Sequence, residues 1–151
     1  RDDYQALIPI LLKFGADFSI KNQGGDSVYH AAITHDCTDL FLNGTLSLVD
    51  KHDLFGWVRP KTENSFLHTT IENADSELVT HILKCVPIAY NLINLKNKKG
   101  LTPLSMCCKR GMHKVIPLLV DLGADVNGGV CLYTGNTALH DAAQIGFIET
   151  V

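Results

Sequence analysis

The sequence predicts an all-α protein built from similar units that follow one another along the chain. One observation is that an apolar run, Gly-Ala-Asp and a short tail occur twice, as "LLKFGADFS" at 11–19 and "LLVDLGADVN" at 118–127. A second is a shorter pattern that occurs four times: "GDSVYHAA" from Gly25, "NSFLHTT" from Asn64, "GLTPLSMCC" from Gly100 and "GNTALHDAA" from Gly135. The third is the spacing of the Ser or Thr in each copy of this shorter pattern. These residues are Ser27, Ser65, Thr102 and Thr137, which are 38, 37 and 35 residues apart. This even spacing indicates a repeat array.

Each copy of the shorter pattern has the features of a helix N-terminus. The Ser or Thr hydroxyl can accept a hydrogen bond from a backbone N–H two or three residues later, and Pro103 fits just inside the helix because its missing N–H is not needed there. His30, His68 and His140 then lie in the first turn, where we expect their imidazoles to bond neighbouring backbone. Ser105 takes the place of the histidine in the remaining copy. A structural hydrogen bond tolerates that replacement, whereas a catalytic or metal-binding set would not.

The Gly-Ala-Asp sequence is expected at the ends of the other helices. Gly15 and Gly123 suit the left-handed residue just past a helix end, and the Asp and Asn that follow suit the tight turn beyond it. Each apolar run before these glycines is therefore expected to be a helix, and each tail leads into the next unit.

The complete pattern, G-x-T-P-L-H-x-A-A followed by an apolar helix and G-A-D-V-N, resembles the ankyrin repeat. Residues 100–127 match at the opening Gly, Thr-Pro-Leu, the mid-repeat Gly111 and the closing Gly-Ala-Asp-Val-Asn. The copy that contains Ser65 departs most, because Glu63 replaces the opening Gly and Ala74 the mid-repeat Gly.

The resemblance implies an ankyrin-repeat solenoid of stacked antiparallel helix pairs with projecting β-hairpin loops. We expect a single domain over residues 1–151, with a partial repeat at 1–22, repeats at about 23–60, 61–96 and 97–130, and a partial repeat at 131–151. The first unit lacks its first helix, the last stops within its second, and the chain has no initiator Met. The sequence is therefore expected to be an excerpt of a longer protein.

Composition and motifs favour a non-enzymatic intracellular protein. The chain is 46% hydrophobic and 19% charged, and its apolar runs are too short to span a membrane. Its five cysteines are odd in number and mostly occupy core-like helix positions, which favours reduced thiols in the cytoplasm or nucleus. "QGGD" and "NGGV" lack the Lys and the helix-opening spacing of phosphate-binding loops, and no nucleophile has a base and an orienting group. We therefore expect no catalytic residues, no cofactor and no bound metal.

The joints between repeats are longer than usual, which suggests a subfamily. Against a unit of about 33 residues, the three spacings carry about five, four and two extra residues, located at 43–62, 86–92 and 128–134. Overlong joints of this kind are similar to those of the inhibitor-of-NF-κB family. "GDSVYHAAITHD" resembles that family's opening repeat, and "LVDLGADVNGGVCLYTGNTALH" its later repeat with a lengthened hairpin. This resemblance implies an alternative function, an IκB-like inhibitor that binds and sequesters an NF-κB/Rel-type transcription factor.

A group of cations predicts where a partner binds. The ankyrin resemblance implies that the hairpin tips and the inner helices make the concave binding face, and five cations of the repeat that begins near Lys96 lie there: Lys96, Lys98, Lys99, Lys109 and Arg110. In a chain of net charge −3 the patch is local, and it is a candidate for an acidic segment of a partner protein. The alternative is that these tips are simply solvated. Nucleic acid is an unlikely partner, because the chain has no extended basic stripe.

Aromatic residues add candidates for partner contacts. Tyr133 and Leu132 lie on the long hairpin after this patch, and Trp57 lies beside Phe55 in the irregular joint further upstream. Exposed aromatic residues beside charges are typical of binding hot spots. Trp57 could instead fold back into the gap left by the missing Gly-Ala-Asp turn. The sequence thus predicts a protein-interaction module that binds through its concave face and hairpin tips.

Overall fold

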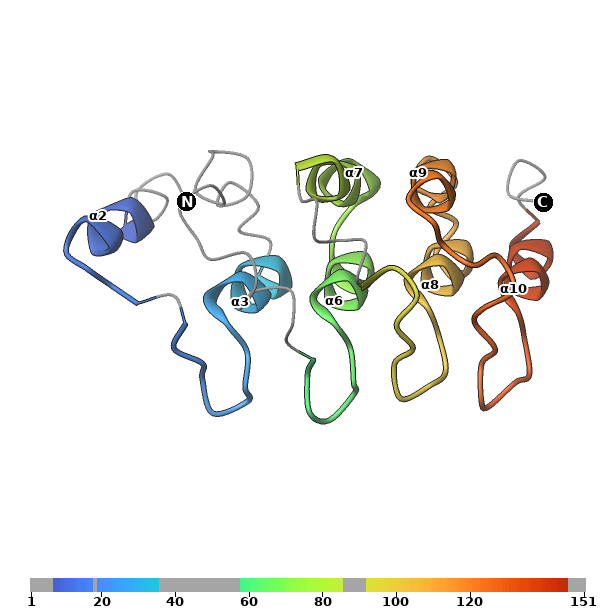
Figure 1. The fold of residues 1–151 in the computed structure, drawn as a ribbon, viewed down its shortest axis with the longest axis horizontal. Coiled ribbons are helices and arrows are strands. Elements are labelled where there is room, and N and C mark those ends of the chain that lie inside the picture. The colour runs from blue at the N-terminus through green and yellow to red at the C-terminus, as the bar shows by residue number, and fades with distance from the viewer. Residues whose placement is uncertain (1–6, 18, 36–57, 86–91, 147–151) are drawn as a thin grey trace.

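The computed structural model describes residues 7–17, 19–35, 58–85 and 92–146, and it shows a row of helices and hairpins (Figure 1). The helices in these ranges are α2 (Leu7–Lys13), α3 (Val28–Thr34), α6 (Phe66–Asn73), α7 (Ser76–Cys85), α8 (Pro103–Lys109), α9 (Ile116–Asp121) and α10 (Ala138–Ile145). The same ranges contain no extended strand, only isolated antiparallel bridges that join Val58 to Ser65 and Val130 to Thr137. None of these helices is long and apolar enough to cross a membrane.

The helices form two rows, and the hairpins project from one row on the side that faces away from the other (Figure 1). Helices α3, α6, α8 and α10 make one row, in which neighbours pack directly against each other, and α2, α7 and α9 make the other. Helix α6 also packs on α7, and α8 on α9. This arrangement confirms the predicted all-α solenoid.

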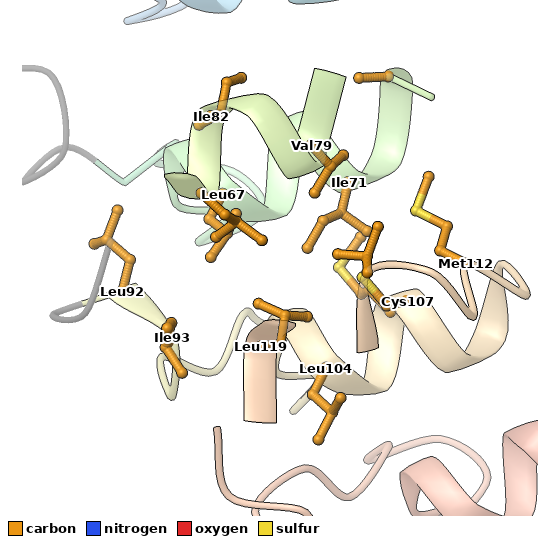
Figure 2. Packing of buried hydrophobic residues seen from close by; sticks show 14 of the residues in the cluster. Leu67, Ile71, Val79, Ile82, Leu92, Ile93, Leu104, Cys107, Met112 and Leu119 are labelled. Carbon is orange, nitrogen blue, oxygen red and sulfur yellow. The ribbon is translucent and has the colours of Figure 1, made fainter. Parts of the chain in front are cut away.

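The core lies between the helix pairs and continues from one repeat to the next. Figure 2 shows Leu67 and Ile71 of α6 on one side and Leu104, Cys107 and Leu119 of the following repeat on the other. All five side chains are buried. Because each repeat covers the apolar face of its neighbour, stability depends on stacking rather than on any single repeat.

The helix starts follow the local signals in the sequence. Ser65 Oγ accepts from the His68 backbone N–H at 3.4 Å, and Thr102 Oγ1 accepts from the Ser105 N–H at 3.3 Å. Pro103 is the first residue of α8, where no N–H is required. These contacts confirm the predicted capping role for Ser65 and Thr102, whereas the Ser27 side chain makes no cap bond and its Oγ lies 2.8 Å from His30 Nδ1 instead.

The histidines also serve the fold. His68 Nδ1 accepts from the Ser65 N–H at 3.2 Å, so the ring proton is on Nε2, which donates to the Leu101 carbonyl at 2.9 Å in the next repeat. His140 Nδ1 accepts from the Thr137 N–H at 3.4 Å. His68 thus confirms the expected bonding to backbone and, in addition, links two repeats.

Left-handed residues end helices and shape the hairpins. Gly15 and Gly123, just after α2 and α9, have φ of 83° and 93°, which confirms their predicted role. Glu63 has φ 55° at the hairpin position where Gly100 has φ 76°. The repeat that departs most from the sequence pattern therefore holds a side chain in a conformation that favours glycine.

Three cysteines, Cys107, Cys108 and Cys131, are buried free thiols. Cys107 and Cys108 lie in α8 and Cys131 in the hairpin that follows α9. Burial raises the pKa of Cys107 well above its usual range and that of Cys108 to about 11. The thiols of Cys107 and Cys108 are therefore protonated at neutral pH and act as apolar packing groups.

Candidate protein-binding site

Neighbouring hairpins are joined to one another through their backbones. The Lys98 N–H donates to the Thr62 carbonyl at 2.9 Å, and the Leu132 N–H donates to the Lys99 carbonyl at 2.9 Å. These bonds hold three successive hairpins side by side, as Figure 1 shows below the α6, α8 and α10 helices. The side chains at their tips therefore form one surface.

The predicted lysines are exposed on or beside this surface. Lys96, Lys98 and Lys99 belong to the hairpin before α8, and Lys109 is the last residue of α8. None of the four forms an ion pair with another residue that the structure describes, whereas Arg59 in the preceding hairpin pairs with Asp26 at 2.8 Å. Their charges are therefore available to a partner.

Arg110 has an intramolecular role that the sequence analysis did not predict. Its Nη1 donates to the Ile71 carbonyl and, at 2.9 Å, to the Ala74 carbonyl at the end of α6. The last carbonyls of a helix have no partner within the helix, and a cation there also complements the helix dipole. Arg110 thus stabilises the preceding repeat, which leaves four of the five predicted cations without such a contact.

Two apolar residues at the tip of the last described hairpin are exposed. Tyr133 is 76% and Leu132 is 74% exposed. Leu132 packs close to Gly100 of the neighbouring hairpin. A Cβ atom built on Gly100 would lie only 2.9 Å from the Leu132 Cγ atom. Trp57 and Phe55 lie outside the described residues, so a binding role for Trp57 stays a prediction.

A small pocket of about 150 Å³ lies between the hairpins. Its walls include Lys98, Lys99 and Tyr133 from the predicted set, together with Lys61 and Thr62 of the preceding hairpin. The structure does not place Lys96, Lys109 or Leu132 in its lining. The predicted residues therefore divide into a group around the pocket and a group outside it.

A chain of buried amides forms the floor of the pocket. Asn97 Nδ2 donates to Asn64 Oδ1 at 2.9 Å, and Asn64 Nδ2 donates to Glu72 Oε2 at 3.0 Å. Asn97 Oδ1 accepts from the backbone N–H groups of Lys99 at 3.0 Å and Leu101 at 3.1 Å. With both ends of each amide engaged, the floor is fixed before any ligand arrives.

Sequence reasoning missed the other residues of this pocket. Lys61 fell in the segment interpreted as an irregular joint between repeats. The two amides of the pocket floor, Asn64 and Asn97, are residue types common in turns, and nothing else in the sequence pointed to a role in binding. Asn64 precedes the capping Ser65, which was the one available hint. Only the pairing of the hairpins brings these residues together.

The opposite side of the molecule offers a different surface. An open groove of about 780 Å³ runs along α7, and its lining mixes acidic and basic side chains, among them Glu77, Lys84 and Lys114. Across the ranges that the structure describes, no group of three or more His, Cys, Asp or Glu could hold a metal ion.

Stacked helix pairs with a continuous surface of hairpin tips define a repeat module of the protein-interaction class. The family model described as "Ankyrin repeats (3 copies)" matches residues 67–151, more than half of the sequence. The chain belongs to the ankyrin repeat family. Ankyrin repeats are protein–protein interaction modules.

Individual relatives are longer than this chain. The fowlpox virus (strain NVSL) ankyrin repeat protein FPV222 is 26% identical over 129 residues, which cover 84% of this chain and 16% of the relative. The nuclear factor NF-kappa-B p100 subunit of Gallus gallus is 38% identical over 69 residues, and that of Xenopus laevis 35% over 65 residues. These matches cover 43% and 42% of this chain and 7% of each p100 subunit.

One solved structure shares the fold over nearly the whole chain. It is that of the predatory endopeptidase Bd0816 from Bdellovibrio bacteriovorus in complex with the immunity protein Bd3460. A chain of that structure is 23% identical with a TM-score of 0.72, and the match covers 97% of this chain and 71% of that one.

Proposed function

We propose that this ankyrin-repeat module binds an acidic segment of a partner protein across its hairpin tips. The observation that carries the proposal is the group of exposed lysines within one repeat: Lys96, Lys98, Lys99 and Lys109. They are concentrated in a chain whose net charge is −3, so the attraction is local. An acidic segment placed here would pair with cations that have no partner among the described residues.

The hairpin surface suits a segment that is extended rather than compact. Backbone bonds between Thr62 and Lys98, and between Lys99 and Leu132, keep three tips in one row. Tyr133, at the end of this row, supplies a large exposed ring that can pack against an apolar residue beside the acidic ones.

Fluorescence anisotropy with labelled peptides tests the proposal. The full chain is titrated with a Glu-rich peptide and with the same peptide carrying Gln at every Glu position. We expect the acidic peptide alone to bind, and its affinity to fall as salt is added, because surface attraction decays over roughly 8 to 10 Å near physiological ionic strength. Equal binding of the Gln peptide would contradict the proposal.

Two double variants make the comparison specific. Lys98→Ala with Lys99→Ala should weaken binding by up to about fivefold for each lysine, the equivalent of about 1 kcal/mol per exposed ion pair. Lys84→Ala with Lys114→Ala removes the same charge from the groove along α7 and should leave affinity unchanged. If both double variants weaken binding equally, the site is not on the hairpin surface. Arg110 is left intact, because its contacts with α6 would confuse loss of binding with loss of stability.

A second candidate is an IκB-like inhibitor that sequesters an NF-κB/Rel-type transcription factor. The similarity to the p100 subunits, 38% identity over 69 residues in Gallus gallus, favours it. Its test is direct mixing of the chain with purified Rel-type dimers followed by size-exclusion chromatography. Failure to co-elute at micromolar concentration would exclude this function and leave the general proposal in place.

We also propose a cytoplasmic or nuclear location, supported by the buried free thiols of Cys107 and Cys108. Fractionation of cells that express the tagged source protein would test it, and recovery from a secreted fraction would overturn it.

A further inference from the structure

We infer that the pocket between hairpins 59–64 and 97–101 receives a single carboxylate side chain, Asp or Glu, of the acidic segment. The inference deepens the proposed function and rests on it. It names one position at which the module would select its partner, and it adds Lys61 as a binding residue.

The size of the pocket fits one side chain. Its volume is about 150 Å³. Sites for small molecules and cofactors span about 300 to 1,000 Å³, well above this value. A carboxylate side chain together with a bridging water is therefore a better match than a complete metabolite.

The charges around the pocket favour an anion. Lys61 belongs to one hairpin, and Lys98 and Lys99 belong to the next, so an entering carboxylate would meet cations from two sides. Glu72 is the acidic residue of the lining, which leaves three positive charges against one negative. None of the three lysines is paired to an acidic residue within the described ranges.

The floor keeps the pocket in shape without competing for the ligand. Asn64 holds the Glu72 carboxylate at 3.0 Å and accepts from Asn97 at 2.9 Å, so these groups satisfy each other. Leu101 and Met106 complete the floor with apolar atoms. An anion would therefore gain its favourable contacts from the lysines and from the hydroxyls of Thr62 and Tyr133.

A carboxylate fits this lining better than a phosphate group does. Phosphate recognition commonly uses the planar fork of arginine, and the lining residues that the structure describes include none. Arg59, the arginine of the adjoining hairpin, already donates to Asp26 at 2.9 Å. The Glu72 carboxylate in the wall would also repel a doubly charged phosphate more strongly than a singly charged carboxylate.

A titration followed by NMR tests the pocket alone. Backbone amide signals of the full chain are recorded while N-acetyl-glutamate N-methylamide is added to millimolar concentration, with N-acetyl-glutamine N-methylamide as the matched neutral control. We expect the glutamate probe to shift the signals of Thr62, Lys98 and Lys99, and the glutamine probe to leave them in place. No shift with glutamate would overturn the inference. Larger shifts of the same signals with inorganic phosphate would overturn its assignment to a carboxylate.

The peptide assay separates this inference from the proposed function. Lys61→Gln should weaken binding of the acidic peptide by up to about fivefold, although Lys61 lies on the hairpin before the one that carries Lys98 and Lys99. Lys109→Gln, a patch lysine outside the pocket, should have a smaller effect. Exchange of each Glu of the peptide for Gln should reveal one position that dominates affinity.

The possible outcomes are distinct. If the peptide binds but Lys61→Gln has no effect and every Glu contributes equally, the proposed function stands and the pocket inference fails. If the peptide does not bind while the glutamate probe still shifts Lys98 and Lys99, the pocket takes a carboxylate and the proposed segment is wrong. Circular dichroism of Lys61→Gln confirms that the fold is retained.

Discussion

Acidification is expected to destabilise this protein because His30 is buried in its neutral form. Its ring is fully covered, with Nδ1 2.8 Å from Ser27 Oγ, and it lies perpendicular to the Phe66 ring at a centroid distance of 5.5 Å. Burial lowers the pKa of His30 from 6.5 to about 4, and the nearby Asp26 carboxylate opposes this shift only in part.

The size of the effect follows from the two pKa values. In the unfolded chain the imidazole takes up a proton near pH 6.5, whereas in the folded chain it does so only near pH 4. The stability that the neutral ring contributes is therefore complete above the unfolded value and is lost as pH falls towards the folded one. At about 1.4 kcal/mol per pKa unit, the loss is about 2 kcal/mol at pH 5 and about 3 kcal/mol once the folded state is also protonated.

Urea unfolding measured at a series of pH values checks this expectation, with His30→Asn as the control. Burial also lowers the pKa of His68, so part of the acid sensitivity will persist in the variant. Between about pH 7 and pH 5 the free energy of unfolding of the wild type should fall by about 2 kcal/mol more than that of the variant. Parallel pH profiles for the two proteins would refute the reasoning, since His30 would then titrate alike in both states.

Three further predictions concern stability and reactivity. Arg110→Ala should lower the free energy of unfolding, measured with urea, by about 1 kcal/mol or more, because carbonyls at the end of α6 lose their donor. The control variant Lys109→Ala should stay within about 0.5 kcal/mol of the wild type in the same assay. Glu63→Gly should raise the midpoint of thermal unfolding, as followed by circular dichroism, because glycine adopts a φ of 55° without the strain that a side chain brings. A lower midpoint would show that the added flexibility of the unfolded chain outweighs this relief of strain. Cys107 and Cys108 should resist alkylation at neutral pH until the protein unfolds, as followed by mass spectrometry, and rapid labelling of either thiol in the native protein would contradict their burial.

The repeat architecture could be predicted from the sequence because its signals are local. The hydroxyl of Thr102, the ring of Pro103 and the left-handed Gly123 each act on the backbone within a few residues. Four copies at nearly constant spacing then indicate the stacking, since one unit cannot bury its apolar face alone.

The candidate site was predicted only in part, because side chains of equal charge look alike in a sequence. Lys98, Lys99 and Arg110 entered the prediction as equivalent cations, yet Arg110 donates to carbonyls of a helix nearly forty residues earlier. Lys61 did not enter it, although the pairing of Thr62 with Lys98 places it at the same pocket as Lys99.

The sequence by itself therefore determined the family, the all-α solenoid and the presence of a basic surface, since these depend on short-range patterns and on composition. Only the tertiary structure decided which cations are available and which residues enclose the pocket. The reason is that both depend on the register between neighbouring hairpins, set by the bonds from Lys98 to Thr62 and from Leu132 to Lys99 and by the buried pair of Asn97 with Asn64. The repeat spacing predicts which units are neighbours, but it does not show which side chains of two neighbouring hairpins meet, as Asn97 and Asn64 do.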